Sequence, residues 1–323
     1  MILDKKHFLF ILILLLLIIY SPFYYVNFLQ TSSIVKKNTY YFLKQNTSQR
    51  SIVEDLNIKN IKTSFVEWKL ISFLNSRKII PKAGEYLIPK NSTILDIQNL
   101  FHDGKTITRS FTLIEGTTAL DLKQKLLDNK YMSGKIDDLA EGIYKPDTYN
   151  FKHGFPRKKM LERMMVAQEN ILNNIWRKKS KLFVLKNKNE LLTLASIIQK
   201  EAKNLNDSRL IASVFINRLE KKMKLQSDVT LAYGFKINGN KITKKMLKSN
   251  HPYNTYYHYG LPPTPISYPG KNALRSLDNI IKTDYLFFVS DGNGNHRFSK
   301  TYRSHKKNIK LWKNKIHKES DAR

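Results

Sequence analysis

The stretch Leu194-Ala-Ser-Ile-Ile-Gln-Lys-Glu201 decides the fold of the central part of this 323-residue chain. As part of a helix from 191 to 202, it repeats apolar side chains at the i, i+3, i+4, i+7 spacing of one helix face. The members of this face are Leu191, Leu194, Ala195, Ile198 and Ala202. Glu201 projects from the edge of the same face, so we expect its carboxyl group to lose hydration and its pKa to rise. A carboxyl group of this kind can act as an acid near neutral pH.

Further secondary structure is predicted on both sides of this helix. Residues 189–225 are expected to form two helices joined near 204–207, and residues 158–178 an earlier one. Residues 285–290 and 295–299 are predicted to be strands, because Asp291-Gly-Asn-Gly between them is typical of a hairpin turn. Residues 84–127 alternate strand, helix, strand and helix, which favours one or two small α+β binding modules. Residues 31–60 are interpreted as a polar juxtamembrane segment that leads into a helix capped by Ser51.

The N-terminus carries an apolar run from Phe8 to Leu29 that follows Lys5 and Lys6. A membrane-spanning helix needs roughly 20 apolar residues, and this run supplies them. A cleaved signal peptide is the alternative, but no small-x-small cleavage pattern follows. We therefore expect an uncleaved anchor, with a cytoplasmic N-terminus and the residues after about 30 outside the cytoplasm.

The composition is strongly basic, with a formal net charge of +30. Lys residues are scattered through every segment, and no nucleic-acid-binding motif accompanies them, so nucleic acid is not expected as a partner. The absence of cysteine excludes disulfides, thiolate metal sites and cysteine nucleophiles. No cofactor or metal motif is present, and none is predicted.

Few other titratable groups compete with Glu201 for a chemical role. Asp207 and Asp228 are interpreted as structural or substrate-positioning residues, and His251, His258, His296 and His305 as loop or surface residues. Hydrolytic glycosidases normally need two carboxylates, whereas a lyase that closes a sugar's own hydroxyl onto its anomeric carbon needs one acid/base group. The loop that holds Tyr253, Asn254 and Tyr256 is either a wall for sugar rings or an ordinary surface loop stiffened by proline.

Several further motifs follow the central stretch in a fixed order. They are Val214-Phe-Ile-Asn-Arg-Leu219, Met223-Lys-Leu-Gln-Ser-Asp228, Tyr253-Asn-Thr-Tyr256, Gly260-Leu-Pro-Pro263 and Tyr285-Leu-Phe-Phe-Val289. In this order the motifs resemble those of the YceG-like endolytic murein transglycosylases. Lys82-Ala-Gly-Glu-Tyr86, Glu141-Gly and Pro146-Asp-Thr-Tyr149 resemble the upstream region of that family.

The resemblance implies an α+β protein with an N-terminal transmembrane anchor (1–30), a periplasmic juxtamembrane and LysM-like region (31–140), and a mixed α/β catalytic domain (141–323). It implies an inner-membrane lyase that cleaves nascent peptidoglycan strands without water. The products would be 1,6-anhydro-N-acetylmuramic acid ends, which limit strand length. Peptidoglycan synthases (penicillin-binding proteins) are the implied protein partners. The alternative function is a catalytically silent cell-wall-binding scaffold that recruits such synthases.

The resemblance places the catalytic glutamate at Glu201. The candidate sugar contacts are Gln226, Ser227, Asp228, Thr230, Asn254 and Tyr256. Two positions depart from the family pattern. Gln199 replaces the first glutamate of a Glu-Lys-Glu triplet, and Val229 replaces the proline that usually follows Ser-Asp. Neither departure removes the acid/base group at 201.

Overall fold

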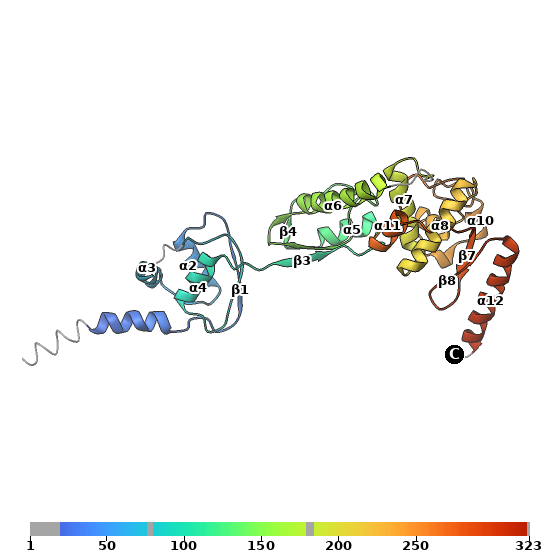
Figure 1. Ribbon diagram of the computed structural model, residues 1–323. Coiled ribbons are helices and arrows are strands. Elements are labelled where there is room, and N and C mark those ends of the chain that lie inside the picture. The colour runs from blue at the N-terminus through green and yellow to red at the C-terminus, as the bar shows by residue number, and fades with distance from the viewer. Residues whose placement is uncertain (1–19, 76–79, 179–183, 322–323) are drawn as a thin grey trace, which may run out of the picture. The chain divides into compact units, whose positions relative to one another are not determined.

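A computed structural model describes residues 20–75, 80–178 and 184–321 of the chain (Figure 1). Within it the chain divides into two compact units. Unit 1 extends to Arg109 and includes residues 150–154, whereas unit 2 contains residues 110–149 and those from Phe155 onward. The division by function, with a catalytic domain that begins at 141, remains a prediction.

Unit 1 is built on the antiparallel strands β1 (Thr39–Leu43) and β2 (Gly84–Ile88). Its helices are α2 (Gln49–Ile58), α3 (Phe65–Leu74) and α4 (Ile94–Asp103). The interpretation of residues 31–60 as a polar juxtamembrane segment is wrong for β1, because Tyr41 and Leu43 are buried in the core of the unit. These two side chains alternate with exposed neighbours, as expected for a strand with one buried face.

The N-cap of helix α2 differs from the predicted one. The helix begins at Gln49, and its N-cap is Ser48 rather than Ser51. The Ser48 hydroxyl accepts a hydrogen bond from the Ser51 backbone N–H at 3.1 Å. An N-cap oxygen bonds the N–H two or three residues further on, so Ser51 receives the cap and does not provide it.

Unit 2 holds most of the helices. They are α5 (Ala119–Leu127), α6 (Arg157–Lys178), α7 (Lys188–Glu201), α8 (Leu205–Glu220), α9 (Asp228–Gly234), α10 (Lys244–Leu247), α11 (Lys271–Asp278) and α12 (Tyr302–Asp321), with a 3₁₀ turn, η1, at Gly239–Lys241. The short strands β4 (Met132–Ser133), β6 (Phe155–Pro156), β7 (Phe287–Ser290) and β8 (His296–Ser299) belong to unit 2, whereas β3 (Arg109–Thr112) and β5 (Thr148–Phe151) include residues of both units. They pair as β3 with β5, β4 with β6 in parallel, and β7 with β8 as an antiparallel hairpin. The predicted helices and the predicted hairpin in this unit are confirmed, with ends that differ by a few residues.

Helix α7 is the central helix of unit 2 and packs against α6, α8, α9 and α11 (Figure 1). The predicted apolar face is confirmed, but burial goes beyond it, since all residues from Leu191 to Ile198 are buried. Thr193 and Ser196 tolerate this burial because their hydroxyls donate to backbone carbonyls of the preceding turn. The helix that ends at Glu201 is therefore held rigidly on all sides.

The predicted membrane anchor falls mostly outside the described residues. Residues 20–31 are helical, but residues 1–19 are not part of the description. From residue 20 to residue 321, apart from the gaps at 76–79 and 179–183, no helix has the length and apolar character needed to cross a membrane.

Candidate active site

Glu201 is the last residue of α7, and Ala202 is the C-cap. Its carboxylate oxygen Oε1 accepts a hydrogen bond of 2.6 Å from the hydroxyl of Ser227. Ser227 is itself buried and precedes the first turn of α9. Among the described residues, no side chain or backbone group bonds the other oxygen, Oε2. The site therefore presents one fixed and one unengaged carboxyl oxygen.

The surroundings raise the pKa of Glu201 above its ordinary value, in the direction that the sequence predicts. Burial is the largest cause, because it penalises the charged form. The negative charges of Asp228 and Asp207 act in the same direction. The Ser227 hydroxyl and the His296 imidazole act in the opposite direction, because they favour the carboxylate. Glu201 is therefore better suited than an exposed glutamate to hold a proton, give it up and take it back.

Arg218, on α8, shapes the segment that leads to Ser227. Its guanidinium donates to the carbonyls of Lys224 and Leu225 at 3.1 and 2.9 Å and to the side-chain oxygen of Gln226 at 3.3 Å. The backbone of Gln226 has φ 50°, a left-handed conformation that few non-glycine residues adopt. The buried guanidinium of Arg218 thus stabilises a tight turn directly before Ser227.

Thr255 fixes Ser227 from the opposite side. Its hydroxyl accepts the Ser227 N–H at 3.0 Å and lies 2.9 Å from the hydroxyl of Thr230. Its carbonyl accepts the Gln226 N–H at 3.1 Å. These bonds join the start of α9 to the loop around residue 255, so the Ser227 hydroxyl is held toward Glu201.

Tyr256 and Asp228 form the second pair at the site. The Tyr256 hydroxyl donates to the Asp228 carboxylate at 2.6 Å. Burial is the main cause of a raised pKa for Tyr256, and the charges of Asp228 and Glu201 add to it. Asn254 is fully buried, and its amide donates to the carbonyls of Met246, Leu247 and Ser249. This geometry favours a loop-organising role for Asn254.

The structure thus gathers the six predicted sugar contacts in two adjacent segments, the start of α9 and the 254–256 loop. Gln226 and Asp228 are exposed, and Tyr256 is partly exposed, so these three are accessible to a ligand. Ser227, Thr230 and Asn254 are buried and bonded within the protein. Direct sugar contact stays a prediction for all six.

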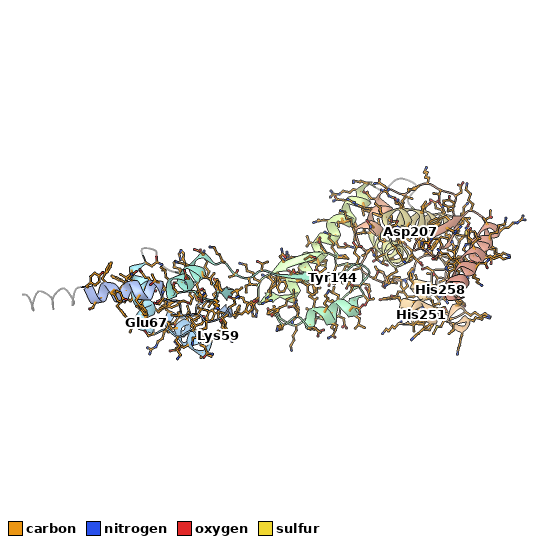
Figure 2. All side chains as sticks on the ribbon, turned by 90° about the horizontal axis from the view of Figure 1, so that it is seen from below. Lys59, Glu67, Tyr144, Asp207, His251 and His258 are labelled. Atoms are coloured by element: carbon orange, nitrogen blue, oxygen red, sulfur yellow. The ribbon has the colours of Figure 1, made fainter. Side chains whose placement is uncertain are left out.

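Two groups of functional interest are held by contacts that the sequence did not predict. Asp207, on α8 (Figure 2), lies 2.8 Å from the ring nitrogen Nδ1 of His296 on β8. Glu141 accepts hydrogen bonds from the Ala119 N–H at 2.9 Å and from the Tyr233 hydroxyl at 3.1 Å. Burial raises the pKa of Glu141. The sequence predicts a structural or substrate-positioning role for Asp207 and a loop or surface position for His296, but not their contact, and Glu141 was identified only through the resemblance of the Glu141-Gly motif.

Gln199, which departs from the family pattern, has a structural role. Its amide oxygen accepts the Gly270 N–H at 2.9 Å, and Glu115 accepts the Lys271 N–H at 3.0 Å. The two side chains therefore satisfy the first amides of α11, a role that a neutral amide fills as well as a carboxylate. At Gly270 a Cβ atom would come within 1.8 Å of the Glu115 carboxyl carbon, so this close approach needs glycine.

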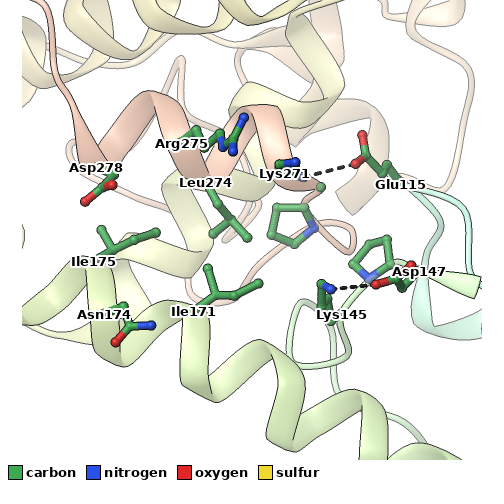
Figure 3. A pocket seen from close by; sticks show the side chains of 13 residues that line it. Glu115, Lys145, Asp147, Ile171, Asn174, Ile175, Lys271, Leu274, Arg275 and Asp278 are labelled. Atoms are coloured by element: carbon green, nitrogen blue, oxygen red, sulfur yellow. Dashed lines mark hydrogen bonds and ion pairs between the residues drawn. The ribbon is translucent and has the colours of Figure 1, made fainter.

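A cavity of about 520 Å³ lies elsewhere in unit 2, between α6 and α11 (Figure 3). Its lining includes Glu115, Lys145, Asp147, Lys271 and Arg275 but not Glu201. Within the described part of the chain, no group of three or more His, Asp or Glu side chains is placed to hold a metal ion.

The chain is similar to proteins of one known family. The YceG-like family matches residues 41–311. The chain belongs to the YceG-like family. A crystal structure of a YceG-like protein from Listeria monocytogenes superposes with a TM-score of 0.52 and 26% identity, over 84% of this chain and 99% of that one.

Two curated relatives are named endolytic murein transglycosylase. The one from Bacillus subtilis is 37% identical over 182 residues, which are 55% of this chain and 49% of the relative. The one from Streptococcus pneumoniae D39 is 34% identical over 176 residues, which are 52% of this chain and 31% of the relative. The chain thus spans half or less of the length of these relatives.

Proposed function

We propose that this YceG-like protein is an endolytic peptidoglycan lytic transglycosylase. The observation that carries the proposal is the Glu201 carboxyl group, which is desolvated, has a raised pKa, and is bonded by Ser227 on one oxygen only. The names of the curated relatives support the same activity.

In the first step, Glu201 gives its proton to the glycosidic oxygen that follows an N-acetylmuramic acid residue. The bond from this oxygen to the anomeric carbon breaks, and positive charge of oxocarbenium type develops on the ring. The Glu201 carboxylate then takes the proton from the C6 hydroxyl of the same sugar. The C6 oxygen bonds to the anomeric carbon, so the net result is an intramolecular transfer that consumes no water.

The residues around Glu201 support both halves of this cycle. Burial favours the protonated form that the first step needs. The Ser227 hydroxyl stabilises the carboxylate that the first step leaves behind. Because Ser227 is fixed by Thr255, this bond costs little reorganisation during the reaction.

We further propose that the activity lies outside the cytoplasm on an N-terminal membrane anchor, with glycan strands as substrate and peptidoglycan synthases as partners. The apolar run from Phe8 to Leu29 supports the anchor. Unit 1, a small α+β unit with its own core, is the part of the chain that would carry a LysM-like glycan-binding role. The basic charge of the chain favours an anionic cell-wall neighbourhood.

The test is to incubate the full chain with uncrosslinked glycan strands and to detect anhydro-muropeptides by mass spectrometry. The native chain should produce them, and Glu201→Gln should not, although it folds. Glu220→Gln, which changes an exposed glutamate on the next helix, is the matched control and should be as active as the native chain. Substantial cleavage by Glu201→Gln would refute the assignment, and retained strand binding without any cleavage by the native chain would favour a scaffold.

A further inference from the structure

A buried acid–imidazole pair lies beside Glu201 and takes no part in the mechanism described above. Asp207 is in the first turn of α8, six residues after Glu201, and its side chain is 3% exposed. The carboxylate oxygen Oδ2 is 2.8 Å from Nδ1 of His296, whose side chain is 13% exposed. A carboxylate with so little access to water needs a partner, and the imidazole supplies it.

Neighbouring contacts fix the orientation of this imidazole. Asn204, the N-cap of α8, donates from its side chain to the side chain of Asn295 at 3.0 Å, which ties the start of β8 to the α7–α8 turn. The ring of Phe288 meets the ring of His296 edge-on, with centroids 5.2 Å apart. The histidine is therefore held by its hairpin, by the helix N-terminus and by an aromatic neighbour.

The pairing also determines which ring nitrogen can act on a ligand. An ionised carboxylate only accepts hydrogen bonds, so Nδ1 carries the proton that points to Asp207. In the neutral imidazole, Nε2 is then a hydrogen-bond acceptor. None of the described residues bonds Nε2. His296 and Asp207 both line a cavity of about 430 Å³, together with Asn204, Leu210, Asn295 and Phe298.

We propose that His296, oriented by Asp207, accepts a hydrogen bond from a sugar hydroxyl of a glycan strand bound in this cavity next to Glu201. A sugar ring offers hydroxyl donors, and Nε2 of an imidazole whose Nδ1 proton points to Asp207 is a matching acceptor. His296 would then be a substrate-binding residue and Asp207 a positioning residue. Asn204, which lines the cavity, follows the end of α7 at Glu201 by three residues, so the cavity lies close to the acid/base group. This inference rests on the proposed function, because it takes a glycan as the ligand.

The test uses two variants of the full chain. His296→Phe keeps a flat ring but removes Nε2. In Asp207→Asn the new side-chain amide can donate to Nδ1, so that Nε2 carries the proton and becomes a donor. Binding of uncrosslinked strands is measured in the Glu201→Gln background, where no turnover occurs. Both changes should weaken binding by about 10-fold, as expected for one lost hydrogen bond with a partner left unpaired. In the active background the loss should appear in KM more than in kcat. Asp284→Asn, which changes an exposed aspartate bonded to Lys300, is the control and should bind as the native chain does.

A second variant separates binding from folding. His296→Gln places an amide near the position of Nε2 and should recover most of the binding that His296→Phe loses. Native-like binding and KM for both His296→Phe and Asp207→Asn would overturn the inference and leave the proposed function intact. Failure of the native chain to form anhydro ends would overturn the proposed function, while the binding measurements would still decide the role of His296.

Discussion

Replacing Ser227 with alanine removes the hydrogen bond that the described residues give to the Glu201 carboxyl group. The bond is 2.6 Å long and Ser227 is 2% exposed, so water cannot easily take its place. A hydrogen bond to a charged group contributes about 1.5–3 kcal/mol. Because this bond favours the carboxylate, its loss should raise the pKa of Glu201 further. Since about 1.4 kcal/mol is a tenfold change in an equilibrium, the alkaline limit of activity should move up by about one to two pH units.

The assay is the rate of anhydro-end formation by the full chain across a pH series. Ser227→Ala should retain activity at a pH where the native enzyme has lost it, although its maximal rate should fall because Glu201 is less well oriented. Ser276→Ala is the control, since the Ser276 hydroxyl is also buried but donates to the carbonyl of Ala273 in its own helix, away from Glu201 in the chain. An alkaline limb that stays in place, or moves to lower pH, would refute the reasoning.

Three further changes test other parts of the structure. Glu201→Gln should be more stable than the native chain at neutral pH. The pKa of Glu201 is higher in the folded than in the unfolded chain, so the native chain loses stability as the pH rises from below the unfolded pKa through the folded one. Glutamine does not titrate and has no such loss. Plots of melting temperature against pH for the native chain and Glu201→Gln should therefore converge in acid. Tyr233→Phe should destabilise unit 2 by about 1–3 kcal/mol, as measured by denaturant unfolding, because Glu141 loses a buried donor. Gly270→Ala should cost about 1 kcal/mol in the same assay, because Glu115 must leave the N-terminus of α11.

Matched controls accompany the last two changes. Tyr259 is 69% exposed, and Tyr259→Phe should leave the free energy of unfolding almost unchanged. A Cβ atom at Gly239 would meet nothing within 4 Å, so Gly239→Ala should be far milder than Gly270→Ala. Equal effects within either pair would contradict the contacts described above.

The local parts of this site could be predicted from sequence because they depend on short-range rules. The 3.6-residue period defined α7 and put Glu201 at the edge of its buried face. Burial around the whole of α7 could not be predicted, because it depends on α6, α9 and α11 arriving from elsewhere in the chain. Strand β1 was missed because its two buried side chains lie within a mostly polar stretch.

The polar pairs of the site could not be predicted either, because their members lie far apart in the sequence. Asp207 and His296 are 89 positions apart, and neither belongs to a local pattern that predicts their contact. Ser227 and Glu201 are 26 positions apart, and only the resemblance placed both near one site. Gln199 was identified as a departure from the family, but its bond to Gly270 required the fold.

The central claim is that one carboxyl group at Glu201 completes the reaction without water. Asp228 lies close enough to influence Glu201 electrostatically, so a hydrolytic route with two carboxylates is the direct competitor. The decisive measurement is mass spectrometry of glycan ends formed by the full chain in water enriched in heavy oxygen. Non-hydrolytic cleavage predicts ends that lack one water relative to hydrolysis products and carry no heavy oxygen. Heavy oxygen at the newly formed reducing ends would contradict the claim.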